Sequence, residues 1–350
     1  MNSKVLIVDD SALMRKFHKQ LLEKVGFITE IARNGEECLA VLNGFAPDVI
    51  VLDINMPVMD GLTCLKEIMR VRPTPVVMVS SITEKGAQET FEALSLGAVD
   101  YIQKPSGRYS YNMGTASAQM AEKILSAASI KLSSSIVRKN KQKLSEESRQ
   151  TPVRKSPPIA LETKKHDLIV VGVSTGGPNC LQTILSTLPV NFSTPIIIAQ
   201  HMPKRFTKVF AERLNSMCQL TVVEVTQKQK VQQGYIYIAQ GDGDIVIEKQ
   251  NIELYVSPVA SDKSYLWHPS VSKLVDTALL SVPPNKLCCI QLTGMGNDGV
   301  QEMLKAFNKG ATTIAESSDT AVVFGMPGEL VKKNGATHVA PNHKIASLLI

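Results

Sequence analysis

Short apolar runs alternate with amphipathic stretches throughout the first third of this 350-residue chain. Five runs, at 4–10, 27–32, 48–54, 75–81 and 100–105, have the length and composition of strands, and the stretches between them have helical spacing. A repeated strand-then-helix order predicts a parallel sheet with helices on both faces. We therefore predict that residues 1–105 form an α/β domain with a doubly wound, flavodoxin-like sheet.

A second α/β pattern fills residues 167–350. Strand-like runs occur at 167–173, 195–202, 221–225, 235–239, 286–294 and 311–316, and helical stretches at 205–217, at 269–280 and from near Asp298. Two further runs, 244–249 and 252–256, are so close together that they predict an antiparallel hairpin. We expect a mostly parallel sheet with an antiparallel hairpin.

The segment between the two patterns, residues 106–166, carries the positive excess of a chain whose net charge is +6. It has 12 Lys/Arg against 4 Asp/Glu, whereas residues 1–105 have 11 against 14 and residues 167–350 have 15 against 14. Its Ser, Lys, Gln and Pro content predicts a flexible basic linker, the start of which can extend the last helix of the first domain. Contact with anionic membranes or acidic partners stays open. No nucleic-acid-binding motif accompanies the charge, so we expect no nucleic-acid partner.

The chain lacks the signals of export. No apolar run reaches the roughly 20 residues that a membrane-spanning helix needs, and the N-terminus becomes acidic before a secretory core can form. The six cysteines are scattered without the spacing of a zinc site or a disulfide framework. We expect a cytoplasmic protein that is not embedded in a membrane.

Polar side chains follow several strands of the first domain. Asp9 and Asp10 follow the first strand, Asp53 the third, Ser80 the fourth and Lys104 the fifth. These positions should meet, because ligands of parallel sheets gather at the carboxyl ends of the strands. Neighbouring carboxylates repel one another unless a cation lies among them. Mg²⁺ suits such oxygen ligands, so the sequence predicts a magnesium site.

The stretch "GVSTGGP", residues 172–178, has three possible interpretations. A dinucleotide-binding loop needs G-x-G-x-x-G and an acid after the next strand, but Ser174 and His201 stand at those places. A nucleotide-binding P-loop needs a lysine that is missing here. The remaining interpretation is G-x-S-x-G, a strand-to-helix turn that exposes a nucleophilic serine.

Two partners for that serine lie at the ends of other strands. His201 ends the second strand of the domain and can serve as the base, and Asp298 follows a later strand and can orient it. The chain order Ser174, His201, Asp298 differs from the order in α/β-hydrolases, so we expect a different fold with the same chemistry. From these residues alone, a serine hydrolase and a turn without chemistry both stay open.

Four motifs of the first domain, "LIVDDS", "VLDINMPVMDG", "VSS" and "DYIQKP", resemble the receiver domain of two-component response regulators. The resemblance implies that Asp53 accepts a phosphoryl group from a histidine kinase of the chemotaxis system. It further implies Mg²⁺ bound by Asp10, Asp53 and the Asn55 carbonyl with support from Asp9, a switch hydroxyl on Ser80, a phosphate partner in Lys104, and a switch-coupled aromatic ring in Tyr101.

The second domain resembles the catalytic domain of the chemotaxis protein-glutamate methylesterases, the CheB family. The resemblance rests on "VGVSTGGP", "IAQHMP", "YIYIAQGD", "PSV", "LTGMGNDG" and "VVFGMP". It implies a nucleophile in Ser174, a base in His201, an orienting acid in Asp298 and an oxyanion donor in the Met295 backbone N–H, without a cofactor in the esterase site. It also implies hydrolysis of glutamyl methyl esters on chemoreceptors, deamidation of receptor glutamines, and activation by phosphorylation of the receiver.

The chain departs from this family at "HPSVS", where the family usually has R-P-S-V-D. His268 replaces an arginine that it does not match in charge, and Ser272 replaces an aspartate, so we expect differences in substrate contacts or domain docking. Trp267 is either a substrate platform or part of the core. A binding module without chemistry and an esterase with another substrate remain alternatives, and the sequence does not specify the receptors, the kinase or the oligomeric state.

Overall fold

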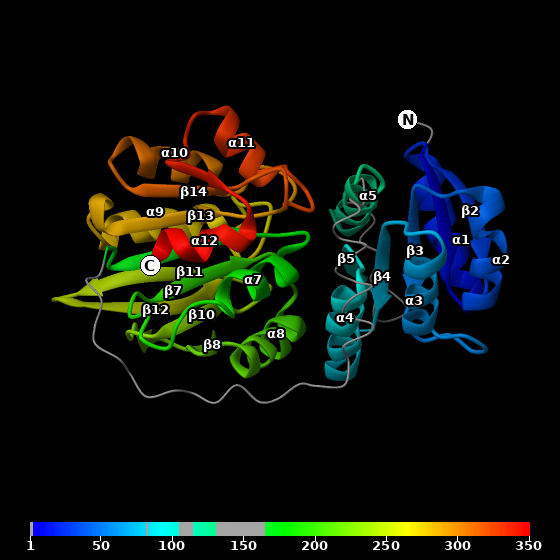
Figure 1. Ribbon diagram of the computed structural model, residues 1–350, viewed down its shortest axis with the longest axis horizontal. Helices are drawn as coiled ribbons and strands as arrows, with labels where there is room; N and C mark the ends of the chain where they lie inside the picture. The colour runs from blue at the N-terminus through cyan, green and yellow to red at the C-terminus, as the bar shows by residue number, and fades with distance from the viewer. Residues whose placement is uncertain (1–2, 82, 105–114, 131–164) are drawn as a thin grey trace. The chain divides into compact units, whose positions relative to one another are not determined.

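The computed structural model describes residues 3–81, 83–104, 115–130 and 165–350 (Figure 1). The chain divides into two compact units, Met1–Gln150 and Thr151–Ile350. The predicted division into 1–105, 106–166 and 167–350 stays a prediction in its detail. None of the described helices combines the length and apolar character needed to cross a membrane.

The first unit is a five-stranded parallel sheet in the order β2-β1-β3-β4-β5. Its strands are β1 (Lys4–Val8), β2 (Ile28–Ala32), β3 (Val49–Asp53), β4 (Val76–Ser80) and β5 (Asp100–Gln103). Its helices are α1 (Ala12–Lys24), α2 (Gly35–Phe45), α3 (Gly61–Val71), α4 (Glu84–Leu96) and α5 (Thr115–Ala128). Helix α1 contacts α5, and α3 contacts both α2 and α4, so each face of the sheet has its own helical layer. The predicted doubly wound fold is confirmed.

Local signals in the sequence start four of these helices. Ser11, Asn34, Asp60 and Thr83 each accept a hydrogen bond from a backbone N–H three residues later, which satisfies a donor that the first turn leaves free. Strands β3 and β4 are buried at every position, as expected for parallel strands covered on both faces.

Helix α5 lies within the segment predicted as a linker. Met120, Ile124 and Ala127 recur with helical spacing and are buried, and the helix contacts β3, β4 and β5. The Nζ atom of Lys123 lies 3.1 Å from Oδ1 of Asp100 on β5. This packing is consistent with a linker start that extends the first domain, whereas residues 131–164 lie outside the described residues.

The second unit contains a seven-stranded parallel sheet in the order β15-β14-β13-β6-β7-β10-β8 and a three-stranded antiparallel sheet in the order β11-β12-β9. The first comprises β6 (Leu168–Val173), β7 (Ile196–Gln200), β8 (Thr221–Val225), β10 (Tyr235–Ala239), β13 (Leu287–Gln291), β14 (Thr312–Glu316) and β15 (His338–Ala340). The second comprises β9 (Gln229–Lys230), β11 (Gly243–Gln250) and β12 (Glu253–Ala260). The predicted antiparallel hairpin is confirmed as β11 and β12.

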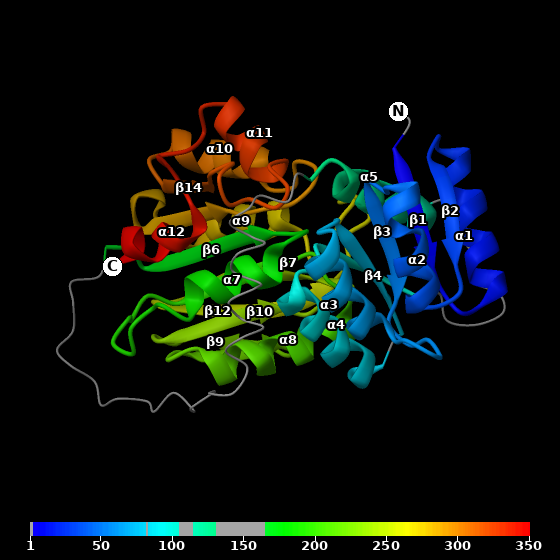
Figure 2. The same ribbon diagram turned by 45° about the vertical axis from the view of Figure 1, so that its right-hand side comes forward.

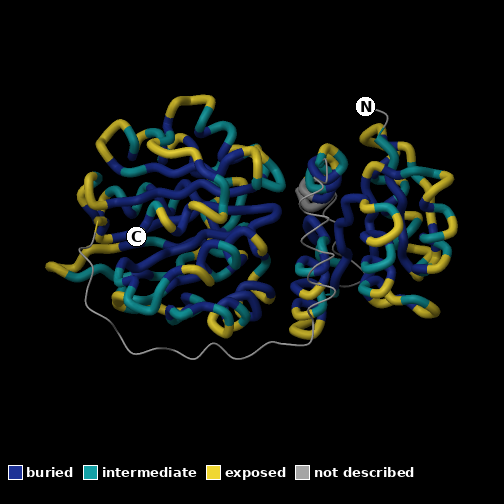
Figure 3. The backbone as a smooth tube through the Cα atoms, in the orientation of Figure 1, coloured by how far each residue is buried: buried dark blue, intermediate teal, exposed yellow. Residues whose placement is uncertain are grey.

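Helices cover the two faces of the large sheet in separate groups (Figure 2). The helices are α7 (Gly177–Leu185), α8 (Lys204–Met217), α9 (Val271–Ser281), the short 3₁₀ helix η1 (Pro284–Lys286), α10 (Val300–Asn308), α11 (Met326–Lys332) and α12 (Asn342–Leu349). Helix α10 contacts α9 and α11, which pack with the β11–β12 hairpin into one core, whereas α7 contacts α8 and α12. The strands between these layers are largely buried (Figure 3).

Strand β6 marks the point at which the order of the sheet reverses. Its neighbours are β7 on one side and β13 on the other, and the helices after β6 and β13 belong to the two different layers. Ligands of doubly wound sheets bind at such a switch point, beyond the carboxyl ends of the strands. Ser174, His201 and Asp298 all follow strands at this point.

Gly172 shows why the turn after β6 is rich in glycine. A Cβ atom at Gly172 would lie 2.3 Å from Cγ1 of Val271, the first residue of α9, so the missing side chain lets this helix approach the sheet closely. Gly176 has a φ of +79°, which other residues rarely adopt. The glycines therefore serve close packing and chain reversal.

Replacing Gly172 tests this packing. We expect Gly172→Ala to lower the free energy of unfolding of the second unit by about 1–3 kcal/mol, because the methyl group displaces Val271. Urea unfolding followed through Trp267, the one tryptophan of the chain, measures the effect. Glu212→Ala is the control, because Glu212 is an exposed residue of α8 in the same unit. An unchanged urea midpoint for Gly172→Ala would contradict the account.

Candidate functional site

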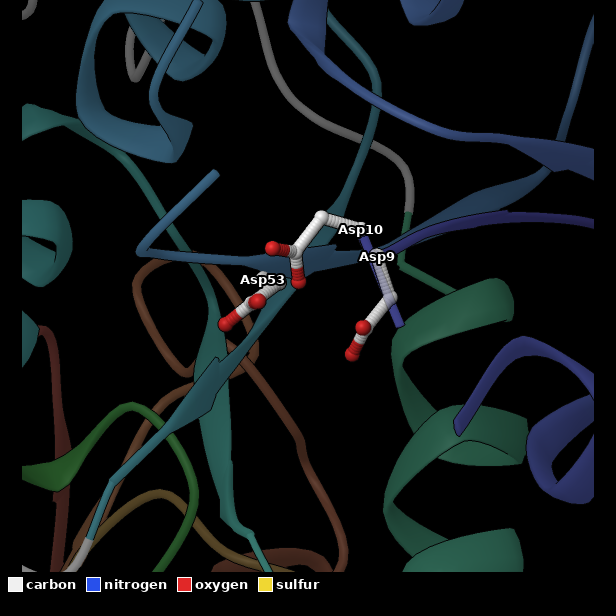
Figure 4. A group of neighbouring side chains, drawn as sticks. All are labelled: Asp9, Asp10 and Asp53. Carbon is white, nitrogen blue, oxygen red and sulfur yellow. The ribbon is translucent and has the colours of Figure 1, made fainter. Parts of the chain in front are cut away.

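Three aspartates meet at the carboxyl end of the first sheet. Asp9 and Asp10 follow β1, Asp53 ends β3, and a carboxylate oxygen from each lies within 4.8 Å of the others (Figure 4). Asp9 and Asp53 are each only 1% exposed, whereas Asp10 is exposed. The structure thus brings together the three acidic residues that the sequence predicted to meet.

Lys104 partly compensates the charge of this acidic cluster. Its Nζ atom lies 2.6 Å from Oδ2 of Asp53 and 3.7 Å from Oδ2 of Asp9. Burial nevertheless raises the pKa of Asp53 to about 6, against the lowering effect of Lys104, and burial also raises the pKa of Asp9. The positive charge of Lys104 therefore does not neutralise the negative charge of the acidic cluster.

The donor atoms of the acidic cluster fit a hard divalent cation. Oδ2 of Asp9 is buried and accepts no hydrogen bond from the described residues, so it is available as a ligand. Carboxylate oxygens are ligands that such cations prefer. The side-chain Nδ2 of Asn55 donates to Glu89 Oε2 at 3.4 Å, and the role of the Asn55 carbonyl stays a prediction.

The predicted switch residues Ser80, Tyr101 and Lys104 lie on or directly after strands β4 and β5. Their side chains differ in the partners that they contact. Ser80 ends β4, next to β3, but its hydroxyl donates to the Gly86 carbonyl in α4 at 3.0 Å. The Ser80 carbonyl accepts the Lys104 N–H at 2.7 Å. The Tyr101 ring is buried at 5% exposure. Of these residues, Lys104 forms an ion pair with Asp53, and the switch roles stay predictions.

In the second unit, His201 and Asp298 form a buried pair. Nε2 of His201 lies 2.9 Å from Oδ2 of Asp298, and the two side chains are 7% and 8% exposed. The chain separates these residues by 97 positions, but β7 and β13 both flank β6 and bring their loops together. The predicted convergence of base and acid is present.

The start of helix α9 holds the Asp298 carboxylate. The backbone N–H groups of Val271 and Ser272 donate to it at 2.7 and 3.0 Å, and the Ser270 hydroxyl donates at 3.3 Å. The N-terminus of a helix carries partial positive charge, so it stabilises the anion. Burial by itself would raise the pKa of Asp298, but the hydrogen bonds from His201 and from the backbone outweigh burial and lower it. Asp298 is therefore a fixed, ionised acceptor for the imidazole.

Ser174 lies beside this pair. It is the first residue after β6, where Val173 pairs with Gln200, and the His201 N–H donates to the Val173 carbonyl at 3.0 Å. Within the described residues no hydrogen bond joins the Ser174 hydroxyl to the imidazole. Such bonds are often long in ligand-free enzymes and shorten when substrate binds. Because Nε2 of His201 faces Asp298, Nδ1 is the nitrogen left for the serine.

A glycine allows the loop after β13 to approach Ser174. The Ser174 N–H donates to the Thr293 carbonyl at 2.9 Å, and a Cβ at Gly294 would lie 2.7 Å from Cβ of Ser174. Within the described residues, nothing accepts the N–H of the next residue, Met295. A donor without an acceptor near the candidate nucleophile suits the predicted oxyanion role of Met295.

The sequence analysis did not identify two residues that support the loop after β13 and the turn at Ser174. Glu316 is fully buried and accepts hydrogen bonds from the Thr293 N–H at 2.9 Å and from the Cys180 thiol at 3.3 Å, and burial raises its pKa. Nε2 of Gln200 donates to the Ser174 carbonyl at 3.0 Å. The available signal was a polar residue at the last position of an otherwise apolar strand, as in "IIIAQ" and "TTIAE".

Both residues that depart from the family pattern have fixed partners. Nδ1 of His268 lies 2.8 Å from Oδ1 of the buried Asp244. The Ser272 hydroxyl donates to Glu302 at 2.7 Å and accepts the Gly299 N–H at 3.0 Å. These contacts give each residue a supporting role near the Asp298 loop.

Trp267 stacks on the imidazole of His201. The ring centroids are 5.6 Å apart, the ring planes differ by 14°, and the tryptophan is partly exposed. Of the two interpretations of Trp267, a platform or a piece of core, the geometry favours a place at the site.

Comparison with known proteins agrees with both halves of the molecule. Residues 5–110 match the response regulator receiver domain, and residues 169–349 match the CheB methylesterase domain. A protein-glutamate methylesterase/protein-glutamine glutaminase of Rhodospirillum rubrum is 47% identical over 352 residues, which cover 99% of this chain and 95% of the relative. One of Carboxydothermus hydrogenoformans is 40% identical over 99% of this chain and 98% of the relative.

A solved structure supports the same assignment for the second unit. The CheB methylesterase catalytic domain of Thermotoga maritima superposes with a TM-score of 0.51 at 40% identity and covers 53% of this chain and 97% of that domain. The matches therefore span the receiver-like sheet, the serine turn and the loops that hold His201 and Asp298. On this evidence the chain belongs to the CheB methylesterase family, with a response regulator receiver domain preceding the esterase domain.

Proposed function

We propose that this chain is a phosphorylation-activated serine esterase. It hydrolyses glutamyl methyl esters on chemoreceptors to glutamate and methanol, and it deamidates receptor glutamines. The observation that carries the proposal is the His201–Asp298 pair, fixed by the start of α9 and placed at the strand end beside Ser174. The names of the related proteins support the same reaction.

Acylation follows from the arrangement of the pair. The Nε2–H of His201 donates to Asp298, so the lone pair of Nδ1 accepts the proton of the Ser174 hydroxyl as Oγ attacks the ester carbonyl. The Met295 N–H stabilises the oxyanion of the tetrahedral intermediate. The carbon–oxygen bond to the methoxy group then breaks, Nδ1 returns its proton to that oxygen, and methanol leaves.

Deacylation repeats these steps with water. Nδ1 of His201 takes a proton from water, the hydroxide attacks the acyl carbonyl, and the bond to Ser174 Oγ breaks as Oγ regains a proton. The product is a glutamate side chain. A glutamine follows the same course with ammonia as the first leaving group. Neither step requires a cofactor.

The acidic cluster of the receiver is proposed as the control site. Asp53 accepts a phosphoryl group from the histidine kinase of the chemotaxis system, and Asp9 and Asp10 would hold Mg²⁺ together with Asp53 and the Asn55 carbonyl. Bound Mg²⁺ would supply positive charge for the transfer. The phosphoryl oxygens then attract Lys104 and draw the Ser80 hydroxyl from Gly86, which shifts the receiver to its active state.

With a histidine kinase and chemoreceptors as partners, the protein would act in the cytoplasm, at the cytoplasmic part of the receptors. An ester on another protein is the alternative substrate, since His268 replaces the family's arginine near the site. A binding module without chemistry is disfavoured, because the His201–Asp298 pair retains the geometry of a general base.

Methanol release tests the proposed reaction. The intact protein incubated with methylated receptor membranes is expected to release methanol faster with acetyl phosphate than without it, and Ser174→Ala is expected to release none. Methylated membranes that yield no methanol with the intact protein would refute chemoreceptor esterase activity.

Removing the charge of Asp298 tests the pair directly. We expect Asp298→Asn to lower kcat by about 10³- to 10⁴-fold with a similar KM, because the base loses its preferred tautomer and its anionic partner. The urea midpoint reported by Trp267 fluorescence controls for misfolding, and His201→Gln should show a comparable loss. A fall in kcat of less than tenfold would argue against the assigned role.

Substitution of Asp53 tests whether its phosphorylation controls the esterase activity. Asp53→Asn should retain the esterase rate measured without phosphodonor and lose the increase caused by acetyl phosphate. Asp60→Asn is the matched control, because Asp60 caps α3 and asparagine also caps helices. If acetyl phosphate still activated the Asp53→Asn protein to the same extent, Asp53 would not be the residue that controls the esterase.

Mg²⁺ binding should depend on pH. The folded-state pKa of Asp53, about 6, exceeds its ordinary value, so ionised Asp53 opposes folding and receiver stability falls as pH rises from about 4 through 6. A cation that binds the ionised form should therefore stabilise the receiver more at pH 8 than at pH 5. Hydrogen-exchange protection of β1 and β3 measures this difference.

Two acidic variants serve as controls for the Mg²⁺ experiment. Asp9→Asn should abolish the added protection, because it removes a buried ligand, and Glu36→Gln, at an exposed acid, should not. Equal protection by Mg²⁺ at both pH values, or retention of the effect in Asp9→Asn, would contradict the assigned site.

A further inference from the structure

The neighbourhood of His201 contains an aromatic residue that the proposed mechanism does not use. We propose that Trp267 is a positioning residue for the base: its indole face fixes the His201 ring and stabilises the imidazolium that forms when Nδ1 takes the Ser174 proton. This inference rests on the proposed function, because the imidazolium arises in that reaction.

The geometry suits a contact between a π face and a cation. The two rings are nearly parallel at 14°, and their centroids are 5.6 Å apart, within the distance of about 6 Å at which a cation is attracted to an aromatic face. Tryptophan has the most favourable aromatic face for such a contact. A neutral imidazole gains less from such a contact than an imidazolium does.

Trp267 also borders the loop that carries the oxyanion donor. A Cβ atom built on Gly296 would lie 3.9 Å from Nε1 of Trp267, and Gly296 directly follows Met295. The indole therefore lies close both to the base and to the predicted oxyanion loop.

A buried carboxylate fixes the segment that presents this indole. Asp244 accepts hydrogen bonds from the Asp262 N–H at 3.0 Å, from Nδ1 of His268 at 2.8 Å and from the Ser270 N–H at 2.8 Å. Asp244 is 1% exposed. The segment is thus tied on both sides of Trp267, and His268 contributes to the position of its neighbour.

Several charged side chains near the two rings, among the residues that the structure describes, have fixed partners. Asp298 faces Nε2 from the loop after β13. His268 and Asp244 lie on the Trp267 side and face each other, and Lys273 of α9 pairs with Asp262 at 3.2 Å. The imidazolium would therefore have a carboxylate at one nitrogen and an aromatic face against its ring.

The fluorescence of the chain's one tryptophan reports this contact without any assay of esterase activity. A protonated imidazole stacked on an indole quenches its emission, so the emission of the full-length protein is expected to fall in a single step as pH is lowered. His201→Gln should abolish that step. His268→Gln should retain it, which separates the stacked imidazole from the adjacent one in sequence.

A matched pair of variants tests the effect on the reaction. Trp267→Leu keeps apolar bulk without a π face and is expected to lower kcat about 3- to 10-fold with little change in KM. Its pH profile for kcat/KM should differ from that of the unmodified protein, because the imidazolium loses its aromatic contact. Trp267→Phe should restore most of the rate. Circular dichroism and urea unfolding verify that both variants fold.

The outcomes separate this inference from the proposed function. A fluorescence step that persists in His201→Gln, or equal kcat values and pH profiles for Trp267→Leu and the unmodified protein, would overturn the role of Trp267. Absence of methanol release together with a normal, His201-dependent fluorescence step would instead refute the esterase function and leave the stacking contact intact.

Discussion

The hydrogen bond between His201 and Asp298 is the interaction on which the rest of the esterase site depends. A buried carboxylate is costly unless hydrogen bonds compensate it, and here the first turn of α9 and the imidazole do so together. The lowered pKa of Asp298 expresses that compensation. Once the carboxylate is fixed, Nε2 of His201 is committed to it and Nδ1 is left for Ser174. The glycines that let α9 and the loop after β13 approach β6 are a precondition of this geometry.

The two units use the same edge of a parallel sheet in opposite electrostatic ways. In the esterase unit, a single carboxylate receives enough donors to stay ionised, which suits a permanent partner for a base. In the receiver, Asp9 and Asp53 share one lysine, and burial raises the pKa of both. That site is incompletely compensated and therefore responsive to a cation or a phosphoryl group. The number of donors that each fold supplies therefore suits the proposed roles of a fixed catalytic pair and an adjustable control site.

Much of this arrangement could be predicted from sequence. Apolar runs identified both sheets, and the topology rule for parallel sheets placed Asp53, Lys104, His201 and Asp298 at functional edges. The short elements β9, β15 and α11 were not predicted. Strands of two or three residues and a helix of seven contain too few residues for their periodicity to be recognised.

The contacts that tune the site could not be predicted. The bonds from α9 to Asp298, the support of Thr293 by Glu316 and the stacking of Trp267 on His201 each join segments far apart in the chain. Their pairing depends on how closely helices and loops approach the sheet, which residue patterns do not encode locally. The signal of Trp267 was ambiguous for the same reason, since a single aromatic residue suits a core as well as a site.

The most direct test of the account is the location of the proton on the His201 ring. Nitrogen-15 NMR of the histidine-labelled, ligand-free protein with the ring neutral reports the tautomer. We expect a proton on Nε2, bonded to Asp298, and an unprotonated Nδ1 available to Ser174. A proton found on Nδ1, with Nε2 bare, would contradict the assignment of the base and of the acid that orients it.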